Sequence, residues 1–256
     1  MNLVIALDKN DLNRIKNAVL GSFFYYESAA STNSEALNCF DAPDKSLFIA
    51  ENQTAGKGRL GRRWEASRGG IYMTILLKPE KMREDISSLT LATGLAASRV
   101  IPKSQIKWPN DIILGGKKAA GILVESKIIG KTMVIAVGIG INADNTEFSE
   151  ELAEKATSIR LFSGEKQDKA ELIIRVYNEF LKVYGEFLEG FEKIRMEYIQ
   201  RCVTLNREIE VIKNSESRKM YAVGIGDSGE LLAEADGKTE RITFGEVSVR
   251  GIMGYS

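Results

Sequence analysis

The stretch Gln105–Asn142, QIKWPNDIILGGKKAAGILVESKIIGKTMVIAVGIGIN, decides the fold. Within it, apolar and β-branched runs alternate with glycine turns at Gly115-Gly116 and Gly130. The predicted strands are 112–114, 121–125 and 132–141. Because connections of about two residues cannot make parallel crossovers, these strands are expected to form a largely antiparallel sheet.

Helical periodicity and further strands surround this stretch. Thr32 and Glu35 have the spacing of a capping box that opens a short helix, and Asp168 is placed to cap a long amphipathic one. Other helices are predicted around Leu12–Val19, over Leu89–Val100 and up to about residue 201, and other strands at 46–51 and 71–77. The mixture indicates an α+β fold.

The sequence changes character near residue 203. Five short strand-like runs follow: 208–213, 220–225, 230–234, 239–244 and 247–250. Turn-forming residues at Asp227-Ser-Gly and Asp236-Gly separate some of them. We therefore predict a main α+β domain over residues 1–203 and a small β-barrel domain over 204–256.

Composition narrows the possible chemistry. The 256 residues include 35 basic and 35 acidic side chains and no histidine, which excludes His-based triads and His-ligated metals. The balanced charge argues against a nucleic-acid or membrane partner. The apolar run at 3–7 is too short for a signal peptide or a membrane span. Two distant cysteines, Cys39 and Cys202, indicate reduced thiols and a cytoplasmic location.

A loop rich in glycine and arginine, QTAGKGRLGRRW, occupies residues 53–64. Its glycines at 56, 58 and 61 can present backbone N–H groups to an anion, and five cations lie within residues 57–68. The loop could close on a phosphate or could be a solvated surface loop. It also matches GxGxxG, but no helix is predicted after it, which argues against a Rossmann site.

Two further segments carry polar groups at predicted turns and strands. Lys107-Trp-Pro-Asn-Asp111 can aim an amide and a carboxylate in a fixed direction, and Lys118 follows at the base of a hairpin. Gly138-Ile-Gly-Ile-Asn142 leaves room above the sheet for something flat. Taken singly, Lys118 could be surface charge, and the glycines could mark a bulge or close packing.

Together these segments closely resemble the biotin protein ligase family. The matching segments are Ser31-Thr-Asn33, 53–64, 107–111, Lys118 with Gly121-Ile-Leu-Val-Glu125, 138–142 and Phe244-Gly-Glu-Val-Ser-Val-Arg250. The resemblance runs from about residue 25 to the C-terminus. It implies a catalytic body like that of class II synthetases, with a mixed, largely antiparallel sheet, and an SH3-like C-terminal β-barrel.

The resemblance implies a two-step, carbon–nitrogen bond-forming reaction. Biotin and Mg-ATP give biotinyl-5′-AMP and pyrophosphate, and a lysine of a biotin carboxyl carrier protein then takes the biotinyl group. Lys118 would lie between the biotin carboxylate and the α-phosphate, Arg59 would hold the adenylate, and Asp111 would hold Mg²⁺ directly or through water. The second step would need no more than a carboxylate to steer or deprotonate the acceptor amine.

Other binding residues follow from the same resemblance. For biotin they are Ser31, Thr32, Gln53, Gly56, Arg59, Lys118, Gly121, Leu123, Gly138 and Gly140. For ATP and the adenylate they are Lys57, Arg59, Arg62, Trp64, Lys107, Asn110, Lys118 and Asn142. Trp64 would stack near the adenine or cover the closed loop. No tightly bound redox cofactor is implied.

Some features depart from the family pattern or leave alternatives open. The loop has Lys57 and Leu60 where the family pattern is richer in arginine, and this leaves open how tightly the loop retains the adenylate. Thirty residues precede Ser31, so we expect the short form without an N-terminal DNA-binding domain. Family habit suggests a homodimer joined through sheet edges. A lipoate–protein ligase and a non-catalytic biotin or nucleotide sensor remain alternatives.

Overall fold

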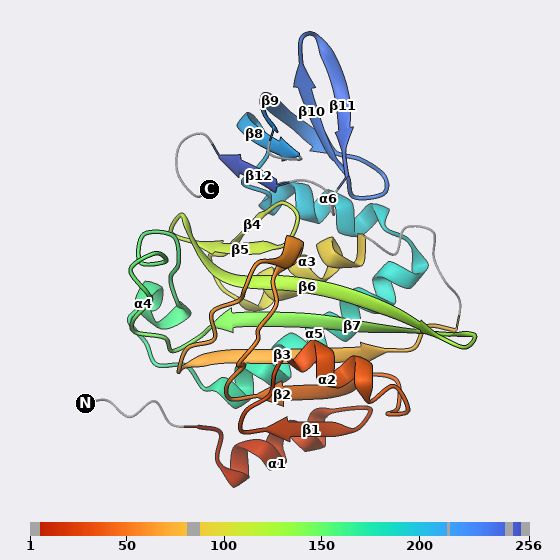
Figure 1. Ribbon diagram of the computed structural model, residues 1–256, viewed down its shortest axis with the longest axis vertical. Helices are drawn as coiled ribbons and strands as arrows, with labels where there is room; N and C mark the ends of the chain where they lie inside the picture. The colour runs from red at the N-terminus through yellow and green to blue at the C-terminus, as the bar shows by residue number, and fades with distance from the viewer. Residues whose placement is uncertain (1–5, 81–87, 214–215, 244–247, 252–256) are drawn as a thin grey trace.

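The computed structural model describes residues 6–80, 88–213, 216–243 and 248–251. Its larger sheet has seven strands in the order β1-β2-β3-β7-β6-β5-β4 (Figure 1). The strands are β1 (Phe23–Tyr26), β2 (Ser46–Ala50), β3 (Gly70–Leu77), β4 (Gln105–Lys107), β5 (Asp111–Leu114), β6 (Lys117–Ile129) and β7 (Thr132–Asn142). Every neighbouring pair is antiparallel except β1–β2, which confirms the largely antiparallel prediction.

The glycine turns lie where the sequence predicts them. Gly115 and Gly116 join β5 to β6 with φ values of 56° and 80°, and Gly130 begins the β6–β7 turn with a φ of 61°. Such positive φ values favour glycine. The parallel edge strand β1 is absent from the prediction, because its sequence FFYY is short and does not alternate. β1 therefore extends the predicted sheet by one strand.

Helices cover the two faces of this sheet unequally. On one face lie α3 (Leu89–Val100), α5 (Lys169–Glu189) and α6 (Glu192–Arg201), with α1 (Lys9–Ala18) against α5. On the other face lies α2 (Thr32–Asn38), in front of the sheet in Figure 1. The larger apolar core fills the first face, while a small cluster under α2 leaves much of the second face open. The open face provides the site.

The helix caps confirm one prediction and correct another. Asp168 caps α5, its side chain accepting a hydrogen bond from the Glu171 N–H. The capping box predicted for Thr32 and Glu35 is wrong, because Ser31 occupies the cap position and makes no side-chain cap hydrogen bond. The Thr32 hydroxyl instead lies 3.2 Å from Gln53 Oε1. Gln53, which is distant in sequence, is therefore the partner of this hydroxyl in place of a backbone N–H of the helix.

The C-terminal strands form a separate antiparallel sheet in the order β11-β10-β9-β8-β12. They are β8 (Arg207–Lys213), β9 (Glu216–Ile225), β10 (Leu231–Ala235), β11 (Lys238–Ile242) and β12 (Ser248–Gly251). These strands confirm the predicted all-β region, although 244 and 247 lie outside the described residues. Trp108 contacts this region, since its Nε1–H donates to the Gly229 carbonyl over 2.9 Å. The domain boundary at residue 203 stays a prediction.

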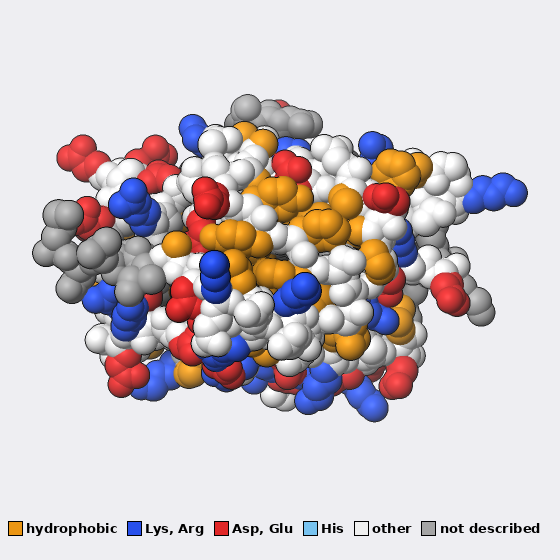
Figure 2. Space-filling model, turned by 90° about the horizontal axis from the view of Figure 1, so that it is seen from below, with side chains coloured by type: hydrophobic (Ala, Val, Ile, Leu, Met, Phe, Trp, Pro, Cys, Tyr) orange, Lys and Arg blue, Asp and Glu red, His pale blue; other side chains and the backbone are white. Residues whose placement is uncertain are grey.

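Apolar side chains are exposed at the end of the molecule that carries β1 and α1. Figure 2 shows apolar side chains gathered at the centre of the face seen from below, the end where Figure 1 places β1 and α1. Leu20, between those two elements, is 73% exposed. Among the described residues, no helix is both long and apolar enough to cross a membrane.

Candidate active site

A cleft of about 1200 Å³ opens on the face of the sheet that carries α2. It brings together the predicted residues Ser31, Thr32, Gln53, Lys57, Arg59, Arg62, Trp64, Lys107, Asn110, Asp111, Lys118, Gly121, Leu123, Gly138, Gly140 and Asn142. Gly56, the remaining predicted residue, lines a neighbouring cleft on the other side of the loop. Segments far apart in sequence thus meet at one place.

Strand register aligns the floor of this cleft. Tyr72, Gly140, Gly121 and Asp111 lie side by side across β3, β7, β6 and β5. Directly paired residues project to the same face of a sheet, so the carboxylate stands at one end of a row that contains two glycines. The row is a flat platform bounded by polar groups.

Two side chains of the protein occupy the room above the glycines. A Cβ at Gly121 or Gly140 would lie only 2.7 or 2.8 Å from the Trp64 ring. A Cβ at Gly138 would collide with the Asn33 amide. The room predicted above Gly138 and Gly140 is taken, in this structure, by the Asn33 amide and by the indole of Trp64, and the contact with Asn33 was not predicted.

A β-bulge directs Lys118 into the cleft. The β5–β6 register shifts between Ile112 and Ile113, so that Ile113 pairs with Lys118 while Ile112 pairs with Ala120. The extra residue reverses the alternation of side chains along β6, which is how bulges re-aim a side chain near functional sites. Lys118 and Gly121 consequently face the same cleft despite being three positions apart.

The Lys118 ammonium lies between a carboxylate and an aromatic ring. Its Nζ is 2.6 Å from Asp111 Oδ1 and 5.3 Å from the centre of the Trp64 ring. The two charged side chains are only 22% and 16% exposed. A positive charge is therefore fixed in a poorly solvated place, where its field is stronger than in water.

Arg59 supplies a second fixed cation from the loop. Its Nη1 donates to Asn110 Oδ1 over 3.1 Å, and among the described residues its buried Nη2 has no hydrogen-bond partner. Burial lowers the pKa of Arg59, and Asp111 partly offsets that effect by raising it. A half-buried arginine with a buried, unused donor is well suited to an anionic ligand.

The glycine-rich loop folds back on itself as a narrow antiparallel turn. Lys57 and Arg63 pair across it, the Gly58 N–H donates to the Arg62 carbonyl over 2.7 Å, and the Trp64 N–H donates to Gly56 over 2.9 Å. The Gly58 N–H is thus used within the loop, and the anion-binding nest predicted from the glycines at 56, 58 and 61 stays a prediction. The charges of the loop lie on its side chains.

Polar groups predicted to bind biotin form their own network. The Thr32 N–H donates to Gln53 Oε1 over 2.8 Å, and the Thr32 hydroxyl hydrogen-bonds the Thr74 hydroxyl over 2.8 Å. Ser31 and Thr32 are buried, at 3% and 4% exposed. Thr74 was not predicted, and its position in a buried strand gave no signal of this role.

Lys107 and Asn142 are both buried at the edges of the cleft, at 7% and 5% exposed. Asn142 Nδ2 donates to the Thr157 carbonyl over 3.0 Å and lies 3.5 Å from the Lys118 carbonyl. Its amide nitrogen therefore supports the backbone beside Lys118.

A segment that the sequence analysis missed closes one side of the cleft. Phe148, Glu151, Leu152, Glu154, Lys155 and Ala156 line it. The backbone of this segment bonds at the central lysine, with the Lys118 N–H donating to the Lys155 carbonyl over 2.9 Å. The segment is polar and irregular in sequence, so no periodic pattern marked it as part of the site.

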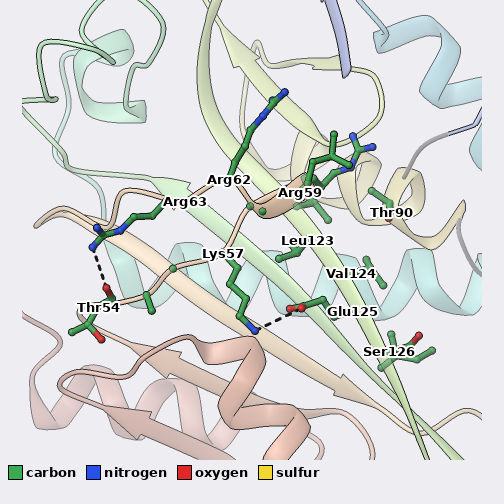
Figure 3. A pocket seen from close by; sticks show the side chains of 17 residues that line it. Thr54, Lys57, Arg59, Arg62, Arg63, Thr90, Leu123, Val124, Glu125 and Ser126 are labelled. Atoms are coloured by element: carbon green, nitrogen blue, oxygen red, sulfur yellow. Dashed lines mark hydrogen bonds and ion pairs between the residues drawn. The ribbon is translucent and has the colours of Figure 1, made fainter. Parts of the chain in front are cut away.

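A second cleft, of about 940 Å³, lies on the other side of the loop. Figure 3 shows Lys57 pointing toward Glu125 on β6, while Arg63 points away toward Thr54. Arg63 Nη2 donates to the Thr54 carbonyl over 3.0 Å. The loop thus separates two clefts and contributes cations to both.

Two family models match the parts of the chain described above. The model of the Biotin/lipoate A/B protein ligase family matches residues 25–142, and that of the Biotin protein ligase C terminal domain matches residues 204–250. The first covers the glycine loop, the central lysine and the floor of the cleft. The second begins where the C-terminal sheet begins.

Individual relatives match over most of the chain. The bifunctional ligase/repressor BirA of Bacillus spizizenii is 30% identical, over 92% of this chain and 76% of its own length. The biotin–[acetyl-CoA-carboxylase] ligase of Paracoccus denitrificans is 30% identical, over 86% of this chain and 98% of its own. A solved structure of Aquifex aeolicus biotin protein ligase with biotin and ATP is 27% identical, with a TM-score of 0.80 over 90% of this chain and 98% of that one.

Proposed function

This chain belongs to the biotin protein ligase family, and on that premise we propose that it uses ATP to activate biotin and transfers it to a lysine of a biotin carboxyl carrier protein. The observation that carries the proposal is the pair of cations, Lys118 and Arg59, held in one cleft with Asp111. The reaction must bring two anionic substrates together, and fixed positive charge lowers that barrier.

In the first step, a biotin carboxylate oxygen attacks the α-phosphorus of ATP. The bond from that phosphorus to the bridging oxygen breaks, and pyrophosphate leaves with the electron pair. Lys118 would stabilise the charge on both reacting groups. Its present contact with Asp111 keeps the ammonium in the cleft before substrates arrive.

Around this centre, the remaining cations would bind the nucleotide. Arg59 would hold the adenylate through its unused Nη2, with Arg62 and Lys107 near the phosphates, whereas the Lys57 ammonium is paired with Glu125. Asn110 would keep Arg59 oriented, as its 3.1 Å hydrogen bond already does. Guanidinium and ammonium groups suit phosphate oxygens because both donate charge-assisted hydrogen bonds.

Biotin would occupy the cleft beside Ser31, Thr32 and Gln53, with Leu123 and the glycine platform near its tail. Trp64 covers that platform, and among the described residues its buried Nε1 has no hydrogen-bond partner. We infer that the indole shares this space with the ligand and donates to it or moves aside. In the second step, the acceptor amine attacks the anhydride carbonyl, and AMP leaves.

Magnesium would enter the site with ATP. Within the described ranges, no three or more carboxylates, cysteines or histidines are grouped to hold a metal by themselves. Mg²⁺ commonly takes one or two carboxylates together with substrate phosphates. Asp111 fits this use, directly or through water, and the ion would neutralise phosphate charge.

We also propose a homodimer joined through the open edge of β6. β5 pairs with β6 only as far as Gly121, so residues 122–129 have no strand partner on that side among the described residues. Open edges pair readily, and Ile128 on this one is 66% exposed. Sedimentation should show that Ile128→Lys gives monomers. A dimer lost instead in Leu20→Lys, near β1, would assign the contact to the other edge.

A cytoplasmic location is a further proposal. It is supported by two free cysteines, the half-buried Cys39 and the buried Cys202, which are usual in a reducing compartment. Cell fractionation with a labelled chain tests it, and recovery with secreted proteins would contradict it.

One experiment tests the function. The protein is mixed with Mg-ATP, a carrier domain and either biotin or lipoate. The mass of the carrier is then determined by mass spectrometry, and the released pyrophosphate is measured. A carrier heavier by one biotinyl group, with biotin-dependent pyrophosphate release, is expected. Lipoate-dependent release would favour a lipoate ligase, and binding of biotin with no pyrophosphate would favour a sensor.

A further inference from the structure

A chain of buried polar contacts leads from the proposed biotin pocket toward the glycine-rich loop. The Thr74 hydroxyl hydrogen-bonds Thr32 over 2.8 Å and lies 2.7 Å from Asn33 Oδ1. Thr74 is fully buried, and Asn33 is 3% exposed. Buried polar groups that find partners keep a defined orientation, so Thr74 fixes the Asn33 amide.

Asn33 in turn orients Glu125. Its Nδ2 donates to the Leu123 carbonyl over 3.1 Å and to Glu125 Oε2 over 2.8 Å. Both amide hydrogens and the amide oxygen are therefore used. Gly138 leaves the space in which this amide sits. One oxygen of Glu125 is thus committed to the protein interior.

The other oxygen of Glu125 faces the loop. Glu125 Oε1 lies 3.9 Å from Lys57 Nζ, as the dashed line in Figure 3 marks. The two side chains are 29% and 49% exposed, respectively. The pair connects the first cation of the loop to β6 and is separate from the contact between Arg59 and Asn110.

We propose that Glu125 is a positioning residue that holds the loop over the active site through Lys57 and so slows the escape of biotinyl-adenylate. The inference rests on the proposed function. It also accounts for lysine at position 57. Because Asn33 holds one oxygen of Glu125, the other oxygen alone faces the loop, which suits a point-like ammonium better than the bidentate fork of arginine.

The test compares adenylate release with adenylate formation. Biotinyl-adenylate is formed on the enzyme, excess substrates are removed, and its release is followed for the parent, Glu125→Gln, Lys57→Met and the double variant. Glutamine keeps an acceptor for Asn33 but removes the charge. Each single change is expected to speed release about two- to five-fold, the range for a partly exposed ion pair. The double variant should release no faster than the faster single variant.

A merely structural role would not give this pattern. Single-turnover pyrophosphate release by Glu125→Gln should equal that of the parent, so retention changes while chemistry does not. Glu240→Gln is the control, since Glu240 also forms a partly exposed ion pair, with Arg218 over 2.6 Å, but in the C-terminal sheet. It should behave as the parent does.

Three results would overturn the inference. They are unchanged release in Glu125→Gln, slower release, which would make Glu125 a charge that repels the adenylate, and additive effects in the double variant. Failure of the proposed function is distinguishable, because then the parent itself would release no pyrophosphate with biotin.

Discussion

β6 carries one member of each of two lysine–carboxylate pairs, and the pairs differ in almost every physical respect. At its start, Lys118 meets Asp111 over 2.6 Å, with both side chains less than a quarter exposed. Farther along, Glu125 meets Lys57 over 3.9 Å, with the lysine half exposed. The first pair lies within the sheet, and the second connects the sheet to a loop.

This difference indicates two uses of the same chemistry. Coulomb attraction grows as distance and local dielectric fall, so the attraction within the first pair is stronger than that within the second. A strong, enclosed pair keeps charge ready where bonds change. A weak, partly solvated pair can break and re-form, which suits a loop that must admit substrates and retain an intermediate.

Removing Lys118 should have the largest effect and tests the first half of the comparison. Lys118→Ala should raise the activation free energy of adenylate formation by about 3–4 kcal/mol, the loss typical of removing a donor that stabilises developing charge. The measurement is biotin-dependent pyrophosphate release in a single turnover.

The neighbouring lysine is a matched control. Lys117 is partly exposed, with its Nζ 2.9 Å from the Ala153 carbonyl and 3.7 Å from Glu154. Lys117→Ala should keep nearly parental activity. Near-normal pyrophosphate release by Lys118→Ala would refute the central role given to that ammonium.

Neutralising Asp111 should have the next largest effect. Asp111→Asn keeps the shape of the side chain but removes the charge that holds Lys118. Adenylate formation should fall about ten- to hundred-fold, as is common when a group that orients a functional side chain is lost. The rate is measured at saturating biotin and Mg-ATP. A parental rate would mean that other groups hold the ammonium.

Arg59 tests the loop side of the comparison. Arg59→Gly removes the contact with Asn110 and the unused buried donor. Because a charged hydrogen bond contributes about 1.5–3 kcal/mol, adenylate release should rise roughly tenfold or more. The escaped adenylate should then label lysines of bystander proteins, detected by a biotin blot. Labelling as strict as that of the parent would contradict the assignment.

The difference between the pairs also marks how far the sequence could predict the site. Residue types and order predicted the hairpins, because glycine turns and strand periodicity are local signals, whereas the segments that meet in the cleft were inferred from the resemblance to biotin protein ligases. The bulge that turns Lys118 toward Asp111 left no such signal, since it depends on how β5 and β6 pair. Sequence spacing alone would put Lys118 and Gly121 on opposite faces of β6.

The sequence also did not predict which side chains fill the space above the sheet. The glycines at 138 and 140 predicted room above the sheet, but only the fold reveals that Asn33 and Trp64 use it. Likewise, Thr32 fitted a capping box locally, yet a partner far along the chain captures its hydroxyl. Long-range contacts decided each of these cases.

Salt should produce the smallest effect and separates the two pairs most directly. Screening acts over about 10 Å at 0.1 M salt and about 3 Å at 1 M, and it acts mainly on exposed charges. The partly exposed Lys57–Glu125 pair should therefore weaken at high salt, while the enclosed Lys118–Asp111 pair should not.

At low salt, Glu125→Gln should release adenylate about two- to five-fold faster than the parent. In roughly 1 M salt the two release rates should converge, because the parent then also lacks an effective pair. Salt acting on the adenylate itself affects both proteins and cancels in their ratio. A ratio that stays constant from low to high salt would mean that Glu125 acts by packing and not by charge, and the contrast between the pairs would then lose its electrostatic basis.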